Sequence, residues 1–239
     1  MKSTCCLFWL CLACLAYSET RHVVKDNPNA SAPYTNWATA AATIQAAINI
    51  SDAGDLVMVS NGVYASGSTV VEGTTHRAAI TNAVTVKSVN GPAETVIHGQ
   101  GAMRCVYLAG GARLTGFTLT NGYANSGAGA YCASTAAGIS NCILTGNSAS
   151  GNGGGAYNGR LDHCTLAGNR SGGGGGGACA SELSNCTLTD NTAVGGGGAA
   201  WTTLYNGLLT GNSANNNGGG ALDCTLYNCT LANNSAGSE

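Results

Sequence analysis

A segment of about twenty-two residues recurs five times in the second half of the chain. The copies are Cys142-Ile-Leu-Thr-Gly-Asn147, Cys164-Thr-Leu-Ala-Gly-Asn169, Cys186-Thr-Leu-Thr-Asp-Asn191, Gly207-Leu-Leu-Thr-Gly-Asn212 and Cys229-Thr-Leu-Ala-Asn-Asn234, and they start 22, 22, 21 and 22 residues apart. Two further columns keep the same step: Ala156, Ala178, Ala199 and Ala221, and Ile139, Leu161, Leu183, Leu204 and Leu226. A fixed period with several apolar positions predicts a solenoid, in which each repeat buries its apolar face against its neighbours.

Each repeat contains three short segments with strand character. In one copy these are a Gly-rich block that ends at Tyr157, a segment around Leu161, and the segment from Cys164 to Leu166. Cys164 and Leu166 are two residues apart and face the same way in a strand, whereas the odd step from Leu161 to Cys164 requires a bend. We therefore predict an all-β parallel β-helix, with triangular coils of about 22 residues.

Two polar or thiol columns run through the repeats. The asparagines predict a ladder of side-chain amides that bond from coil to coil: Asn147, Asn169, Asn191, Asn212 and Asn234. The cysteines at Cys142, Cys164, Cys186 and Cys229 are predicted to pack like small apolar residues. Stacked residues lie about 4.8 Å apart, so disulfide pairing within this column stays open.

The N-terminal half precedes the regular repeats. Residues 19–36 are polar and are predicted to be irregular, and Thr39 to Ile50 predicts a short amphipathic helix with an apolar side at Ile44, Ala47 and Ile48. From Asp55 the apolar period changes to two, which predicts short strands up to residue 119. We therefore divide the mature chain into an N-terminal segment with a capping helix, 19–54, and a β-helix, 55–239.

Residues 1–18 have the features of a signal peptide. Lys2 supplies the positive start, residues 5–16 are apolar, and Ala16-Tyr-Ser18 resembles a cleavage site. The apolar run is too short to span a bilayer, and no later stretch is long enough. We expect an exported protein without a membrane span in its mature part, located outside the cell or on a bacterial outer membrane. Export also permits disulfides among its eight remaining cysteines.

The strand and turn motifs resemble a known class of proteins. The helix followed by Asp55-Leu-Val-Met-Val-Ser-Asn-Gly-Val-Tyr64, and then Gly116-Phe-Thr-Leu-Thr-Asn-Gly122, resembles the start of bacterial right-handed parallel β-helix proteins of the pectin-lyase-like superfamily. The pairing of Gly153-Gly-Gly-Ala156 with Leu166-Ala-Gly-Asn169 is similar to the repeat of chlamydial polymorphic outer-membrane proteins. The resemblance implies a right-handed β-helix whose N-terminal end is covered by the helix.

Charge is scarce, and this narrows the possible functions. Charged residues make up 8% of the chain and the net charge is −2, so the basic surface that nucleic acids require is missing. The regular repeats hold one group of charged and titratable side chains, which are the candidate catalytic residues: Arg160, Asp162, His163 and Glu182. We interpret this group mainly as a solvated face with an Arg160–Glu182 ion pair, and we expect neither a metal site nor a cofactor.

The preferred hypothesis is an exported structural, adhesin-like or passenger module. The alternatives are a polysaccharide lyase or glycoside hydrolase, and a non-catalytic glycan binder that uses the neighbouring tyrosines Tyr205 and Tyr227. The expected partners are a polysaccharide or another surface protein. Glu239 follows the last asparagine without a capping element, so we expect either further coils or end-to-end association through this coil.

Overall fold

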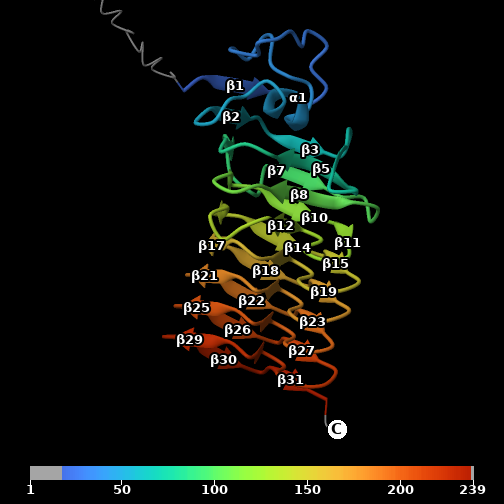
Figure 1. The fold of residues 1–239 in the computed structure, drawn as a ribbon, viewed down its shortest axis with the longest axis vertical. Helices are drawn as coiled ribbons and strands as arrows, with labels where there is room; N and C mark the ends of the chain where they lie inside the picture. The colour runs from blue at the N-terminus through green and yellow to red at the C-terminus, as the bar shows by residue number, and fades with distance from the viewer. Residues whose placement is uncertain (1–17, 238–239) are drawn as a thin grey trace, which may run out of the picture.

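Each regular coil consists of four short strands separated by four corners. The computed structural model describes residues 18–237, in which the coils stack along one axis (Figure 1). One coil contains β16 (Ala156–Tyr157), β17 (Arg160–Asp162), β18 (Thr165–Ala167) and β19 (Arg170–Ser171). The parallel solenoid with its coils of about 22 residues is confirmed, but the predicted three-strand triangle is wrong, because a fourth strand follows each ladder asparagine.

The first two sheets carry the leucine and the cysteine-leucine segments. The first sheet contains β1 (Thr20–Val23), β2 (Leu56–Val59), β6 (Thr85–Ser88), β9 (Arg113–Thr115), β13 (Gly138–Ser140), β17, β21 (Glu182–Ser184), β25 (Thr203–Tyr205) and β29 (Thr225–Tyr227). The second contains β3 (Gly62–Tyr64), β7 (Thr95–His98), β10 (Thr118–Thr120), β14 (Ile143–Thr145), β18, β22 (Thr187–Thr189), β26 (Leu208–Thr210) and β30 (Thr230–Ala232). All neighbours in both sheets are parallel and in register.

The other two sheets close the coils. The third sheet contains β11 (Tyr123–Ala124), β15 (Ser148–Ala149), β19, β23 (Thr192–Ala193), β27 (Ser213–Ala214) and β31 (Ser235–Ala236). The fourth contains β4 (Thr69–Val71), β5 (Thr74–Ile80), β8 (Arg104–Leu108), β12 (Ala130–Cys132), β16, β20 (Ala178–Cys179), β24 (Ala199–Ala200) and β28 (Ala221–Leu222). Its β4–β5 pair is antiparallel, and this hairpin was not predicted from the sequence.

Left-handed backbone conformations make the corners between strands. Between the first and second sheets, φ lies between 50° and 53° at five equivalent residues: Asn141, His163, Asn185, Asn206 and Asn228. Asparagine tolerates this region better than most residues because its short side chain can bond locally. The corner explains why asparagine recurs in this outer column, which has no part in the buried ladder.

The core of each coil is narrow and apolar. Ala156, Leu161 and Leu166 point inward from three successive strands, Cys164 does so from the corner before β18, and all four are at most 2% exposed. The predicted bend between Leu161 and Cys164 is confirmed, because both are buried although they are an odd number of residues apart. The same set recurs in the next coil, so one continuous core runs along the solenoid.

The predicted asparagine ladder is present and buried. Oδ1 of Asn191 accepts hydrogen bonds from both the backbone N–H and Nδ2 of Asn169, each at 3.0 Å. Nδ2 of Asn169 also donates to the carbonyl oxygen of Leu144 at 2.8 Å. The same pattern joins Asn147 to Asn169, Asn191 to Asn212 and Asn212 to Asn234. Each coil is therefore tied to the next through side chains as well as through its strands.

A column of glycines packs against the ladder. A Cβ atom at Gly155 would lie 2.6 Å from the carbonyl oxygen of Gly177 and 3.1 Å from Nδ2 of Asn169. Equivalent contacts recur at Gly177, Gly198 and Gly220. The Gly-rich block and the asparagine thus belong to one packing unit, because only glycine leaves room for the amide beside it.

The N-terminal end is covered by α1 (Ile44–Ile48), with Ile44, Ala47 and Ile48 buried in the core as predicted. The helix is shorter than the expected Thr39–Ile50. Oγ1 of Thr43 accepts from the N–H of Ala46 and starts the helix, while Ala41 bridges to Val23 in an extended conformation.

Two other expectations concern the residues before this helix. The segment predicted to be irregular contains β1. Its residues alternate between buried and half-buried positions, but most of them are polar, so the sequence did not indicate a strand. The predicted signal peptide, 1–18, lies outside the described residues apart from Ser18. No helix of residues 18–237 is long and apolar enough to cross a membrane.

Asn191→Ala should lower the free energy of unfolding by about 2 to 4 kcal/mol, because it leaves the buried N–H groups of Asn169 and the carbonyl of Leu166 without partners. The control is Asn185→Gly, which removes an exposed amide at a corner where glycine is tolerated. Urea unfolding of the two variants should give well-separated midpoints. Equal midpoints would contradict a stabilising role of the ladder.

Candidate functional site

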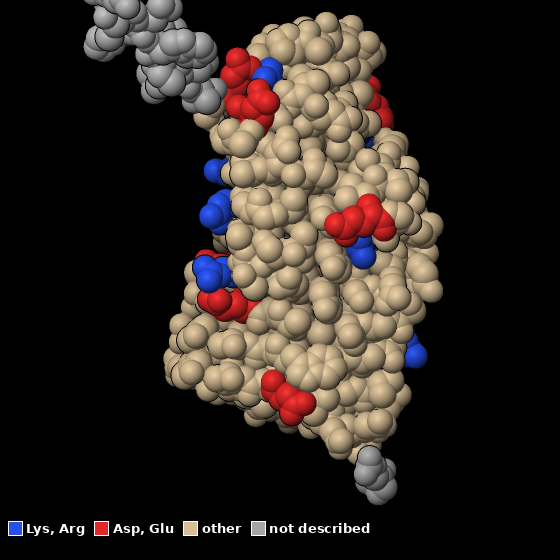
Figure 2. All heavy atoms as spheres, viewed as in Figure 1, with Lys and Arg blue, Asp and Glu red and all other residues tan. Residues whose placement is uncertain are grey.

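The four charged or titratable residues singled out from the sequence do come together, with three on the outer face of the first sheet and His163 at the corner beside it. Arg160 and Glu182 are register partners, with Nε and Oε2 3.3 Å apart. Nδ1 of His163 lies 2.9 Å from Oδ2 of Asp162. Side-chain hydrogen bonds from His163 and from Asn185 lower the pKa of Asp162. The group consists of two exposed pairs. Figure 2 shows that charged side chains are few on the face in view.

A shallow hollow of about 220 Å³ lies next to this group. Arg113, Gly138 and Arg160 are consecutive register partners, and the missing side chain at Gly138 opens the space between the two arginines. Nη1 of Arg113 leans over Gly138, 3.0 Å from where a Cβ atom would be. Sequence reasoning missed Arg113, because it precedes the regular repeats and lies 25 residues before its register partner Gly138, whereas the repeats step by 21 or 22.

This arrangement does not supply the groups that glycosidic cleavage uses. Glycosidases need a carboxylic acid with a raised pKa opposite a second carboxylate. The pKa of Asp162 is lowered instead, and Glu182 is paired with Arg160. Within residues 18–237, no group of three or more His, Cys, Asp or Glu side chains is arranged to hold a metal ion.

Tyr205 and Tyr227, which the glycan-binding alternative invokes, form a stacked pair. The rings of Tyr205 and Tyr227 are 4.9 Å apart and inclined by 6°, and both are exposed. A second column, on the fourth sheet, stacks Tyr107 on Tyr131 and Tyr131 on Tyr157. In both columns neighbouring rings stack face to face along the solenoid axis, so each ring covers one face of its neighbour.

The thiols of the cysteine column each make the same kind of hydrogen bond. Sγ of Cys142, Cys164 and Cys186 each donates to the carbonyl oxygen two residues earlier, at 3.2 to 3.3 Å. All eight cysteines of the described residues are free. Burial raises the pKa of Cys142 to about 11. The column thus packs as predicted, and Gly207 interrupts it without disturbing the register.

A buried cationic group lies near the N-terminal end of the fourth sheet. Nη1 of Arg104 donates to Nδ1 of His76 at 3.2 Å, and Nε2 of His76 lies 3.3 Å from the carbonyl oxygen of Val71. The guanidinium also lies 4.7 Å from the ring centre of Tyr131 and donates to the carbonyl of Gly127. Burial and the charge of Arg104 lower the pKa of His76 to about 4. Sequence reasoning missed this group, since its members are scattered among three coils.

Comparison of the chain with protein-family models, with curated proteins and with solved structures finds no match.

The free energy of unfolding should fall as the pH drops from 6.5 towards 4. The unfolded chain protonates His76 below about pH 6.5, whereas the folded chain resists protonation until about pH 4. Because one pKa unit corresponds to about 1.4 kcal/mol, the loss should approach 3 kcal/mol, roughly. The free energy of unfolding, measured with urea at several pH values in this range, should change less with pH in His76→Gln than in the wild type. The same pH dependence in both proteins would contradict this role of His76.

Folded protein treated with iodoacetamide at pH 8 should react first at Cys224 and Cys229. Both are half-buried in the last described coil, whereas Cys105 and Cys132 are fully buried and burial raises the pKa of both to about 12. Peptide mass spectrometry against time would measure each rate, with urea-unfolded protein as the control. Equal rates in the folded protein would disprove this order.

Proposed function

We propose that the chain is an exported structural module, which serves as a rigid stalk or passenger on a cell surface and presents its outer faces to partners. The observation that carries the proposal is the unbroken in-register stack of coils locked by the asparagine ladder. Nine strands in the first sheet, spaced about 4.8 Å apart, give a rod of about 40 Å. Such a rod, as residues 18–237 form it, suits the mechanical role of a stalk.

Export is supported by the N-terminal sequence. Lys2, the apolar run and the Ala16-Tyr-Ser18 pattern are the features that secretion machinery recognises. Membership of the pectin-lyase-like superfamily, with a right-handed coil and repeats of the chlamydial surface-protein type, is part of the same proposal. It rests on the motifs around Asp55 to Tyr64 and on the Gly-Gly-Gly-Ala and Leu-x-x-Asn pairs.

The alternative is enzymatic cleavage of extracellular polysaccharide, for which the group of Arg160, Asp162, His163 and Glu182 would be the candidate active site. Its test is a lyase assay on polygalacturonate with calcium. Formation of unsaturated product that is lost in Arg160→Ala would favour this alternative over the structural role.

The export that this proposal requires is tested by locating the protein in expressing cells. In intact expressing cells, an antibody against the folded chain should label the surface or precipitate the protein from the medium, and the mature N-terminus should lie near Glu19. Deletion of residues 1–18 should retain the protein inside the cell. Detection of the full-length chain only in the cytoplasm, with residues 1–18 still attached, would overturn the proposal.

A further inference from the structure

One exposed tryptophan occupies a corner where the other coils have small or polar residues. Trp201 lies between β24 and β25 with φ of 51°, and Asn158, Ala180 and Asp223 hold the same corner in other coils. It is 50% exposed, although burial of an indole is strongly favourable. A large aromatic at this corner is therefore a departure from the repeat that the fold itself does not require.

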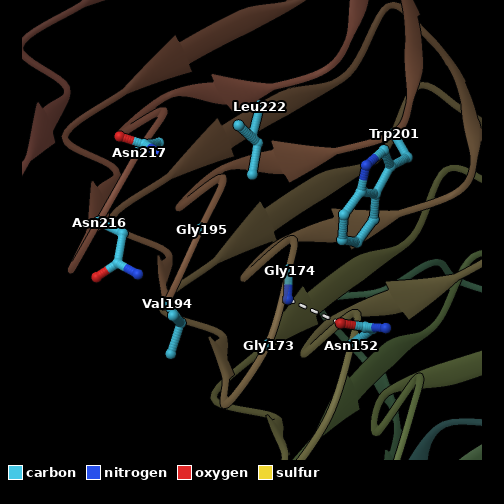
Figure 3. A pocket seen from close by; sticks show the side chains of 9 residues that line it. All are labelled: Asn152, Gly173, Gly174, Val194, Gly195, Trp201, Asn216, Asn217 and Leu222. Carbon is cyan, nitrogen blue, oxygen red and sulfur yellow. Dashed lines mark hydrogen bonds between the residues drawn. The ribbon is translucent and has the colours of Figure 1, made fainter.

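Glycine backbone forms a floor that the outer edge of the ring contacts. A Cβ atom at Gly174 would be 2.6 Å from Cζ3 of Trp201, so the indole contacts the bare main chain there. Gly174 bridges to Gly195 in the next coil, where a Cβ atom would meet Cδ2 of Leu222 at 2.8 Å. The glycines thus create a hollow of about 270 Å³ beside the indole (Figure 3).

Amides line the side of the hollow opposite the indole. Figure 3 shows Asn216 and Asn217 across the glycine floor from Trp201, and both are exposed to solvent. Asn152 is held in place, because its Oδ1 accepts from the N–H of Gly174 at 2.8 Å. Each exposed amide offers two donors and an acceptor to a ligand.

None of the nine residues that line the hollow is charged. An indole face packs well against the C–H groups of a sugar ring, and side-chain amides match its hydroxyls as donors and acceptors. A nucleic acid or an acidic polymer would find no cation among these residues. From this combination we infer that the hollow around Trp201 binds a neutral saccharide, one pyranose unit resting on the indole and its neighbours reaching the asparagines.

The site differs from the stacked tyrosines. Tyr205 and Tyr227 each cover one face of the other ring, whereas the indole of Trp201 borders an open hollow. The inference does not depend on whether the protein is a stalk, since the site would serve a secreted binder equally well.

The test is affinity electrophoresis of the folded chain in gels that contain hydroxyethyl cellulose, galactomannan or soluble starch as neutral polymers, and polygalacturonate as an acidic one. At least one neutral polymer should retard the wild type. Trp201→Asn, which keeps a residue suited to this corner, should weaken that binding at least ten-fold. Tyr123→Ala is the control, because Tyr123 is an exposed aromatic side chain that does not line this hollow.

Circular dichroism and the urea midpoint establish that Trp201→Asn is folded. Gly174→Ala provides a second variant, which should also weaken binding by displacing the ring. Retardation by polygalacturonate alone, retardation by no neutral polymer, or unchanged binding in Trp201→Asn would each overturn the inference.

Discussion

The buried amide of one asparagine per coil is the interaction on which the solenoid depends. Its oxygen accepts two bonds from the preceding coil, and its nitrogen donates both to the next asparagine and to a leucine carbonyl of the preceding coil, as in Asn169. A buried amide without these partners would be costly, so a slip of one residue is penalised in every coil at once. The ladder therefore sets the register that the small core alone would specify weakly.

The ladder also dictates the composition of the chain. Since the amides occupy the corner before the third sheet, the facing position must be glycine, as at Gly155 and Gly177. The interior then holds little more than one alanine, two leucines and a thiol in each coil. The outer faces carry none of these constraints, which leaves them free to vary. A residue such as Trp201 can therefore acquire a role of its own without disturbing the stack.

Sequence reasoning succeeded where the period determines the geometry. Arg160 and Glu182 were expected to pair, and Tyr205 to neighbour Tyr227, because a fixed repeat brings equivalent residues into register. It failed where two residues make a strand, as in β19, although the small buried column Ala149, Ser171, Ala193 and Ala214 carried that signal. The hollow beside Trp201 could not be predicted from the sequence. It depends on the contact of the indole with Gly174 of the preceding coil, which the repeat period does not specify.

Hydrogen exchange of the ladder asparagines tests the central claim most directly. The backbone N–H groups of Asn169 and Asn191 donate within the buried ladder. Their protons should therefore be among the slowest to exchange, at rates set by opening of the whole stack. Protons of the exposed side-chain amides of Asn185 and Asn206 should exchange far faster. Comparable protection of the two columns, or rapid exchange at Asn169 and Asn191, would contradict a ladder that holds the coils together.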